Sequence, residues 1–190
     1  MFPFKHIILA SKSPRRKQLL KQIGINFSIE ISGIDETIEL DLSPHHIAEN
    51  LSKENARKVS QKFPEELVIG ADTLVVYKKQ ILGKPKNNTE SFDMLSMLSG
   101  KTHKVITGVS LQCINKNINK TFHETTKVTF NTLSNSYISH YIKTYKPYDK
   151  AGSYGIQDWF AVCVRKIDGC FYNVMGLPLA KFWKEITELR

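Results

Sequence analysis

The chain has 190 residues and a formal net charge of +9. This length suffices for one well-buried α/β domain and is too short for two ordinary independent domains, so residues 1–190 are expected to form a single domain. No apolar run approaches the roughly 20 residues that span a bilayer, which excludes a membrane-spanning protein. The positive charge favours an anionic partner such as a nucleotide, a polyphosphate or a nucleic acid. Three cysteines (Cys113, Cys163 and Cys170) without metal-ligand spacing indicate reduced thiols, and we expect a cytoplasmic protein.

The stretch Ile7–Arg16 predicts a strand, a basic turn and the start of a helix. Ser13 has the chemistry of a helix N-cap, and Pro14 suits the first helical position because its φ already matches the helix. The first N–H groups of a helix are unpaired and carry partial positive charge. Together with the neighbouring basic residues, this turn is therefore expected to hold an anion such as a phosphate chain. The alternative is a capped helix with solvated basic residues.

The next segments predict a second strand, an acidic loop and a second helix. Apolar and polar residues alternate over Ile25–Ile31, a pattern typical of a strand with one buried face. Asp35 and Glu36 follow that strand, where side chains commonly face a site, although a plain acidic loop is the alternative. Ser43 and Pro44 open a helix whose inward stripe includes Asn55. This amide must find a hydrogen-bond partner or line a wet cleft, and a satisfied core amide is the commoner explanation.

Two apolar runs from Leu67 to Val76 predict a central strand covered on both faces. Asp72 interrupts these runs, and a charge in such a strand is costly unless it is paired, hydrogen-bonded or beside a cation. Gly70 and Ala71 leave room for a bend or a close backbone approach. We favour a functional role for Asp72 over a structural capping role because nothing else in the core pattern requires a charge.

The rest of the chain continues the alternation of strands and helices. Residues 147–158 lack periodicity and combine charges, two glycines and a carboxamide, which is typical of a binding loop. His103 and His123 have no partner at ligand spacing, so we expect surface or hydrogen-bonded structural histidines. The expected elements are a hairpin at 77–82, a helix capped at Asn88 or Thr89 and ending at Gly100, strands at 104–114 and 121–130 with a break at Thr107-Gly108, a helix capped by Ser134 with Tyr137 and Tyr141 inward, a hairpin of 160–166 with 170–174 across Asp168-Gly169, and a final helix from Gly176 that buries Phe182 and Trp183.

An ordered series of motifs resembles the Maf family of nucleoside triphosphate pyrophosphatases over Leu9 to Leu179, nearly the whole chain. The resemblance implies a mixed twisted sheet with flanking helices and two lobes around a central cleft, an α/β fold of the Maf/ITPase-like kind. It also implies hydrolysis of a nucleoside triphosphate to the monophosphate and pyrophosphate, with a divalent metal, and a homodimer. The motifs are LASKSPRR at 9–16, GIDE at 33–36, GADT at 70–73, LGKP at 82–85, LSGKTHKVITGV at 98–109, DKAGSYGIQ at 149–157 and VMGLPL at 174–179.

Three positions that separate subgroups of this family carry Arg15, Thr73 and Gln157. With these residues the chain resembles the subgroup that hydrolyses dTTP and UTP, and we expect it to remove non-canonical pyrimidine nucleotides. Two positions depart from the family pattern. Asn55 stands where many members have lysine. If that lysine contacts phosphate, either Lys53 or Lys58 substitutes for it or the affinity is lower. Asp158 stands where a glycine is common.

The resemblance places the family's proton acceptor on Asp72. Asp72 and Glu36 would hold Mg²⁺ or Mn²⁺, since hard cations prefer oxygen ligands. A uracil or thymine edge offers carbonyl acceptors and one N–H donor that guanidinium and carboxamide groups can match. The expected catalytic residues are Asp72, Glu36, Lys84 and Arg16, and the expected substrate-binding residues are Ser11, Ser13, Arg15, Thr73 and Gln157.

Two other functions compete with this interpretation. One is a house-cleaning pyrophosphatase for modified or purine nucleotides. The other is a non-enzymatic nucleotide or nucleic-acid-binding regulator of cell division. The aromatic residues sit at core-periodic positions instead of forming a stacking platform, which speaks against nucleic-acid binding.

Overall fold

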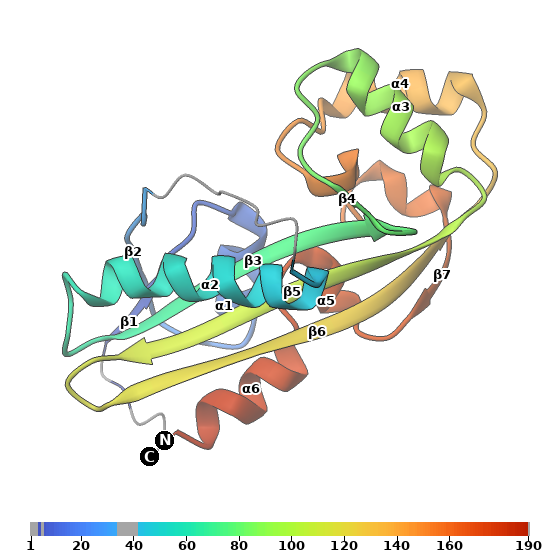
Figure 1. The fold of residues 1–190 in the computed structure, drawn as a ribbon. Coiled ribbons are helices and arrows are strands. Elements are labelled where there is room, and N and C mark those ends of the chain that lie inside the picture. The colour runs from blue at the N-terminus through green and yellow to red at the C-terminus, as the bar shows by residue number, and fades with distance from the viewer. Residues whose placement is uncertain (1–3, 5, 34–41, 190) are drawn as a thin grey trace. The chain divides into compact units, whose positions relative to one another are not determined.

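A computed structural model describes residue 4, residues 6–33 and residues 42–189 (Figure 1). Strands and helices are interspersed along the chain, with two short 3₁₀ segments, η1 and η2, after the fourth helix. In chain order they are β1 (Ile7–Leu9), α1 (Pro14–Gln22), β2 (Ser28–Ile29), α2 (Pro44–Ser60), β3 (Leu67–Tyr77), β4 (Gln80–Leu82), α3 (Asn88–Leu98), β5 (Thr102–Cys113), β6 (Ile118–Phe130), α4 (Asn135–Tyr145), η1 (Ala151–Ser153), η2 (Trp159–Cys163), β7 (Val164–Asp168), α5 (Phe171–Met175) and α6 (Leu179–Thr187).

Within the described residues the strands form one mixed seven-stranded sheet, which confirms the predicted α/β class. Its order is β2-β1-β3-β5-β6-β7, and β4 pairs with β3 as a separate hairpin. β1 runs parallel to both of its neighbours, β2 and β3, whereas β6 and β7 are antiparallel. None of the helices described is long and apolar enough to cross a membrane.

The chain divides into two compact units, in agreement with the two predicted lobes. Unit 1 comprises residues 1–72, 107–124 and 176–190, and unit 2 comprises residues 73–106 and 125–175. The central cleft between the lobes and the treatment of residues 1–190 as a single domain stay predictions.

In unit 1, α2 packs on the sheet with its backbone against two glycines. A Cβ built on Gly70 of β3 would lie 2.1 Å from the carbonyl oxygen of Ser52. A Cβ built on Gly108 of β5 would lie 2.1 Å from the carbonyl oxygen of Ala48. Real Cβ contacts are never this short, so only glycine allows α2 to approach both strands. The close approach predicted at Gly70 is confirmed, whereas the predicted break at Thr107-Gly108 is wrong because β5 runs through it unbroken.

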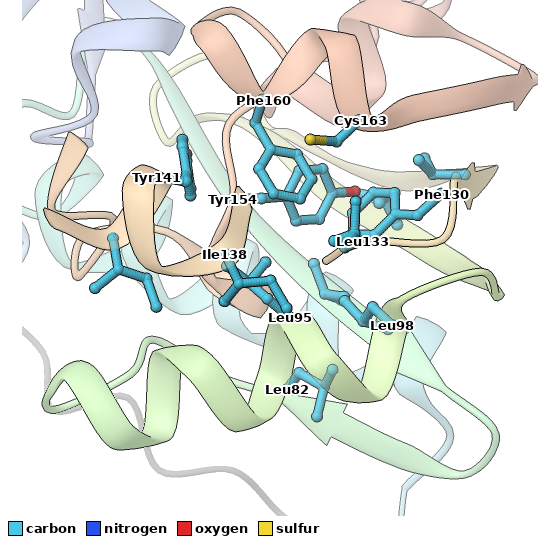
Figure 2. Packing of buried hydrophobic residues seen from close by; sticks show 14 residues of the cluster. Leu82, Leu95, Leu98, Phe130, Leu133, Ile138, Tyr141, Tyr154, Phe160 and Cys163 are labelled. Atoms are coloured by element: carbon cyan, nitrogen blue, oxygen red, sulfur yellow. The ribbon is translucent and has the colours of Figure 1, made fainter. Parts of the chain in front are cut away.

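The core of unit 2 is built around aromatic rings (Figure 2). Phe130 meets Tyr154 and Phe160 edge-on, with ring centroids 4.8 and 4.9 Å apart. Tyr141 of α4 packs on Phe160 at 4.8 Å. These edge-to-face contacts add to the free energy of apolar burial. Leucines of α3 close the cluster, since Leu95 and Leu98 are fully buried.

Three predicted segments differ from the structure. The strand expected over Ile25–Ile31 is reduced to the two exposed residues of β2, because β2 is the edge strand and leaves Ile29 and Ile31 exposed. The hairpin expected across Asp168-Gly169 is absent from the described chain, since β7 pairs with β6 and residues 171–175 form α5. The segment expected to begin that hairpin is the 3₁₀ turn η2 up to Cys163.

Three predicted helical details are also wrong. The N-cap of α3 is Asn87, one residue before the predicted position, and its side chain accepts from the N–H of Glu90. Tyr137 of α4 and Trp183 of α6 were expected inward but are exposed, because each lies beside the buried stripe of its helix. The stripe of α6 is formed by Leu179, Phe182 and Ile186 instead.

Candidate active site

The turn between β1 and α1 gathers hydroxyl groups around one arginine. Ser13 is the N-cap of α1, and its Oγ accepts from the N–H of Arg16 at 3.5 Å. Ser11 Oγ accepts from the N–H of Ser13 at 3.2 Å and from Nη1 of Arg16 at 3.0 Å. The Nε of Arg16 donates to the carbonyl of Gly176 at 2.9 Å. The first turn of α1 holds no acidic side chain, so the cation and the helix N-terminus together favour an anion there.

This turn lies at a topological switch point of the sheet. β1 has β2 on one side and β3 on the other, and all three strands are parallel. Ligands of open α/β sheets bind outside the carboxyl ends of the strands at such a point. The carboxyl ends are tied together by the N–H of Ala10, which donates to Ile69 at 2.8 Å, and that of Glu30, which donates to Leu9 at 3.3 Å. Ser11 therefore lies just beyond the carboxyl end of β1, at the same end of the sheet toward which the parallel strand β3 runs.

Asp72 lies on β3 three residues beyond the last residue paired with β1. The five residues Leu67–Ala71 that precede it are buried, and Asp72 and Thr73 are half-buried. The parallel pairing directs Asp72 toward the same sheet edge as Ser11. A half-buried carboxylate on a central strand can act as a proton acceptor or as a metal ligand.

Asn55 is a satisfied core amide, as predicted from its place on the buried stripe of α2. Its Nδ2 donates to the carbonyl of Leu51 at 2.9 Å, and its Oδ1 accepts from Ser32 Oγ. This bond joins α2 to the segment that follows β2. Lys53 and Lys58, the proposed substitutes for a phosphate-binding lysine, are both exposed on α2.

In unit 2 one backbone hydrogen bond joins the loops that carry Lys84 and Gln157. The N–H of Gly152 donates to the carbonyl of Gly83 at 3.0 Å. Lys84 is exposed between this bond and the buried Pro85, and Gln157 is exposed immediately after the buried Ile156. The backbone at Lys84 is therefore held on both sides, by the Gly83 hydrogen bond and by the buried Pro85. The backbone at Gln157 is held on one side, by the buried Ile156.

The loop that carries Gln157 holds an unusual backbone. Gly152 has a φ of 65° and Ser153 has a φ of 64°, a region that side chains other than glycine rarely adopt. A Cβ on Gly152 would lie 2.8 Å from Val75 Cγ1. The Oγ of Ser153 is buried against Ser91 Oγ, and its N–H donates to Lys150 at 3.1 Å. Backbone held in sparsely populated conformations is typical of functional loops.

The side chains of Tyr141 and Asp158 complete this loop, and sequence reasoning did not assign either of them a role in the site. Tyr141 donates to Asp158 Oδ2 and accepts from the N–H of Gly155, both at 3.0 Å. Asp158 Oδ1 accepts from the N–H of Phe160 at 3.0 Å and so caps η2. Burial raises the pKa of the Tyr141 hydroxyl, which therefore stays protonated as a donor. An N-cap signal at Asp158 was present in the sequence, but its bond to Tyr141 was not.

The two predicted structural histidines are confirmed as hydrogen-bonded. Nε2 of His103 lies 2.8 Å from the hydroxyl of Tyr154, and Nδ1 of His123 lies 2.7 Å from Glu49 Oε1. Burial lowers the pKa of His103 to about 4, so its ring is neutral at pH 7.

The structure brings together Ser11, Ser13 and Arg16 in unit 1, and it directs Asp72 toward their sheet edge. Arg15 is half-buried in the first turn of α1. Asp35 and Glu36 lie outside the described residues. Thr73, Lys84 and Gln157 belong to unit 2, and their convergence with the residues of unit 1 stays a prediction.

Of the two predicted metal ligands, Asp72 lies among the described residues and Glu36 lies outside them. Among the described residues no group of three or more His, Cys, Asp or Glu side chains could hold a metal ion. Mg²⁺ is commonly bound by one or two carboxylates together with substrate phosphates and water. The half-buried oxygens of Asp72 fit that mode of binding, and no larger protein cage is required.

Comparison with known proteins places the chain in a family. Residues 6–189 match the family model described as Maf-like protein. A dTTP/UTP pyrophosphatase of Cytophaga hutchinsonii is 46% identical over 184 residues, which is 96% of this chain and 84% of that protein. A dTTP/UTP pyrophosphatase of Bacillus pumilus is 48% identical over 175 residues, or 92% of each chain. Among solved structures, a dITP/XTP pyrophosphatase from Mycobacterium abscessus aligns with a TM-score of 0.43 and 10% identity, covering 67% of this chain and 75% of that one. With the matched model spanning nearly every residue and relatives this similar, the chain belongs to the Maf-like protein family.

Proposed function

We propose that this chain hydrolyses dTTP and UTP to the nucleoside monophosphate and pyrophosphate. One observation carries the proposal: the anion-binding turn of Ser11, Ser13 and Arg16 follows β1 at the sheet edge toward which β3 carries Asp72. Phosphoryl transfer requires a cation-lined cradle for phosphate oxygens and a general base that orients the attacking water and accepts its proton. The relatives named dTTP/UTP pyrophosphatase support the choice of nucleotide.

The proposed mechanism divides the chemistry between the acidic residues and the basic turn. Asp72 orients the attacking water and accepts its proton as the phosphoanhydride between the α- and β-phosphates breaks. Arg16, Ser11 and the N–H groups of α1 bind phosphate oxygens and stabilise the charge on the departing pyrophosphate. Lys84 places a further positive charge beside the phosphates. Mg²⁺ or Mn²⁺, held by Asp72 and Glu36, would neutralise phosphate charge and lower the pKa of a bound water.

The base is read by groups that match its edge. Thymine and uracil present two carbonyl acceptors flanking one N–H donor. The guanidinium of Arg15 and the carboxamide of Gln157 supply donors, and the carboxamide oxygen supplies an acceptor. Cytosine presents the reverse pattern, an amino group and an unprotonated ring nitrogen, so a carboxamide held in the orientation that pairs with thymine or uracil would leave polar groups unpaired against it.

The test is release of pyrophosphate from a nucleotide panel with Mg²⁺ or Mn²⁺. We expect turnover with dTTP and UTP that exceeds turnover with CTP, GTP and ATP. Asp72→Asn is expected to keep the thermal midpoint within a few degrees and to lose at least about 10²-fold in kcat, the lower end of what general-base removal costs. Asp93→Asn, an exposed aspartate of α3, is the matched control and should leave kcat unchanged.

Three results would contradict the proposal. Full pyrophosphate release by Asp72→Asn would remove Asp72 from the chemistry. Preferred hydrolysis of a purine or modified nucleotide would favour the house-cleaning activity, and salt-sensitive nucleic-acid binding without hydrolysis of any nucleotide would favour the regulatory function.

A further inference from the structure

We infer that Tyr141 and Asp158 are positioning residues that fix the Gln157 segment and thereby set the preference for thymine and uracil over cytosine. This inference rests on the proposed function, because it concerns the residue proposed to read the base. It adds to that function a side-chain pair that restrains the backbone on both sides of Gln157 and need not touch the nucleotide.

The side chains of Tyr141 and Asp158 hold both ends of the same short segment. Tyr141 accepts from the N–H of Gly155 on one side of Gln157 and donates to Asp158 on the other, at 3.0 Å in each case. One hydroxyl thus links the backbone two residues before Gln157 to the side chain one residue after it. A segment tied at both ends in this way has little freedom to change its course.

Asp158 also ties this segment to the next element, η2. Its Oδ1 accepts from the N–H of Phe160 at 3.0 Å, which caps η2. Phe160 is 1% exposed and packs on Phe130 in the core of unit 2. The carboxylate therefore transmits the rigidity of the aromatic core to the segment that bears Gln157.

The segment itself is closely packed. A Cβ on Gly155 would lie 2.7 Å from Asp158 Oδ2 and 2.9 Å from Lys150 Cε. The Tyr141 ring is fully buried and stacks on Tyr145 with an interplanar angle of 22°. The donor hydroxyl is consequently held by packing, and the backbone from which the Gln157 carboxamide projects is held in one course. Discrimination between hydrogen-bonding patterns requires such preorganisation.

The experiment compares kcat and KM for dTTP and dCTP in the wild type and in Tyr141→Phe, which removes only the hydroxyl. We expect the ratio of kcat/KM for dTTP over dCTP to fall on the order of tenfold, through a higher KM for dTTP with a nearly unchanged kcat, since the base lies away from the reacting bond. Tyr145→Phe is the matched control, because it stacks on Tyr141 without entering the pair of bonds to Gly155 and Asp158. It should keep the wild-type ratio.

A second pair of variants tests the network from its other end, and also serves if Tyr141→Phe fails to fold. Asp158→Ala removes the cap and the acceptor for Tyr141, and it should lower the dTTP/dCTP ratio. Asp158→Asn keeps a hydrogen-bonding group at both places and should restore most of the ratio. If Tyr141 and Asp158 had a purely structural role, Tyr141→Phe and Asp158→Ala would lower the thermal midpoint and leave the dTTP/dCTP ratio unchanged.

An unchanged ratio in Tyr141→Phe and Asp158→Ala, in an enzyme whose wild type prefers dTTP, would overturn the positioning role alone. An equal fall in Tyr145→Phe would also overturn it, because general packing would then explain the loss. A wild type that releases no pyrophosphate from any nucleotide would refute the proposed function itself, before any variant is compared.

Discussion

Burial of His103 predicts that unit 2 loses stability as the solution becomes acidic. The side chain is 2% exposed and burial lowers its pKa from 6.5 to about 4. Between these two values the unfolded chain binds a proton that the folded chain does not, so the free energy of unfolding falls as the pH is lowered. The loss begins near pH 6.5 and levels off below pH 4. At 1.36 kcal/mol for each unit of pKa, it amounts to about 3 kcal/mol in total, most of which is already lost at about pH 4.5.

The assay is urea unfolding at about pH 7 and about pH 4.5, followed by circular dichroism. His103→Gln removes the titrating ring while leaving a group that can bond to the hydroxyl of Tyr154. In this variant most of the 2–3 kcal/mol difference attributed to His103 should vanish. His140→Gln, an exposed histidine of α4, is the control and should keep the wild-type pH dependence. The reasoning is refuted if His103→Gln and the wild type lose the same free energy between the two pH values.

Two further variants test the packing that holds the site. Gly70→Ala places a methyl group 2.1 Å from the carbonyl oxygen of Ser52, so we expect a loss of about 3 kcal/mol or more in urea unfolding; a loss below about 0.5 kcal/mol would mean that α2 shifts freely. Ser13→Ala removes the cap of α1 and should cost about 1 kcal/mol and raise the KM for dTTP. An unchanged KM beside the expected loss of stability would show that the cap supports the helix but not the phosphate cradle.

Local signals predicted the helix starts and the anion-binding turn. Ser13, Ser43 and Ser134 cap their helices because each side chain reaches an N–H three residues ahead, a distance that the sequence specifies directly. The same locality placed Ser11 and Arg16 in one turn. Asn55 was predicted correctly as a satisfied amide because its partner at Leu51 lies one helical turn away.

Features that depend on distant partners could not be predicted. The hairpin expected beyond Gly169 is replaced by α5, because Asn173 of that helix donates to Val105 and to Thr126 Oγ1, each at 3.0 Å, from elements far away in sequence. A turn signal in the sequence does not reveal that competition. The bond between Tyr141 and Asp158 spans 17 residues and escaped sequence reasoning for the same reason.

Because α2 contacts the sheet through two glycines, the position of this helix does not depend on the side chains of its exposed surface. The helix rests on Gly70 and Gly108 through the carbonyl groups of Ser52 and Ala48, so its height above the sheet depends on main-chain atoms that every residue type supplies. Its outward residues, such as Lys53 and Arg57, can consequently be replaced by residues of another charge without moving the helix. Descendants of this chain could therefore retune their electrostatic potential toward a charged substrate while the catalytic scaffold keeps its dimensions.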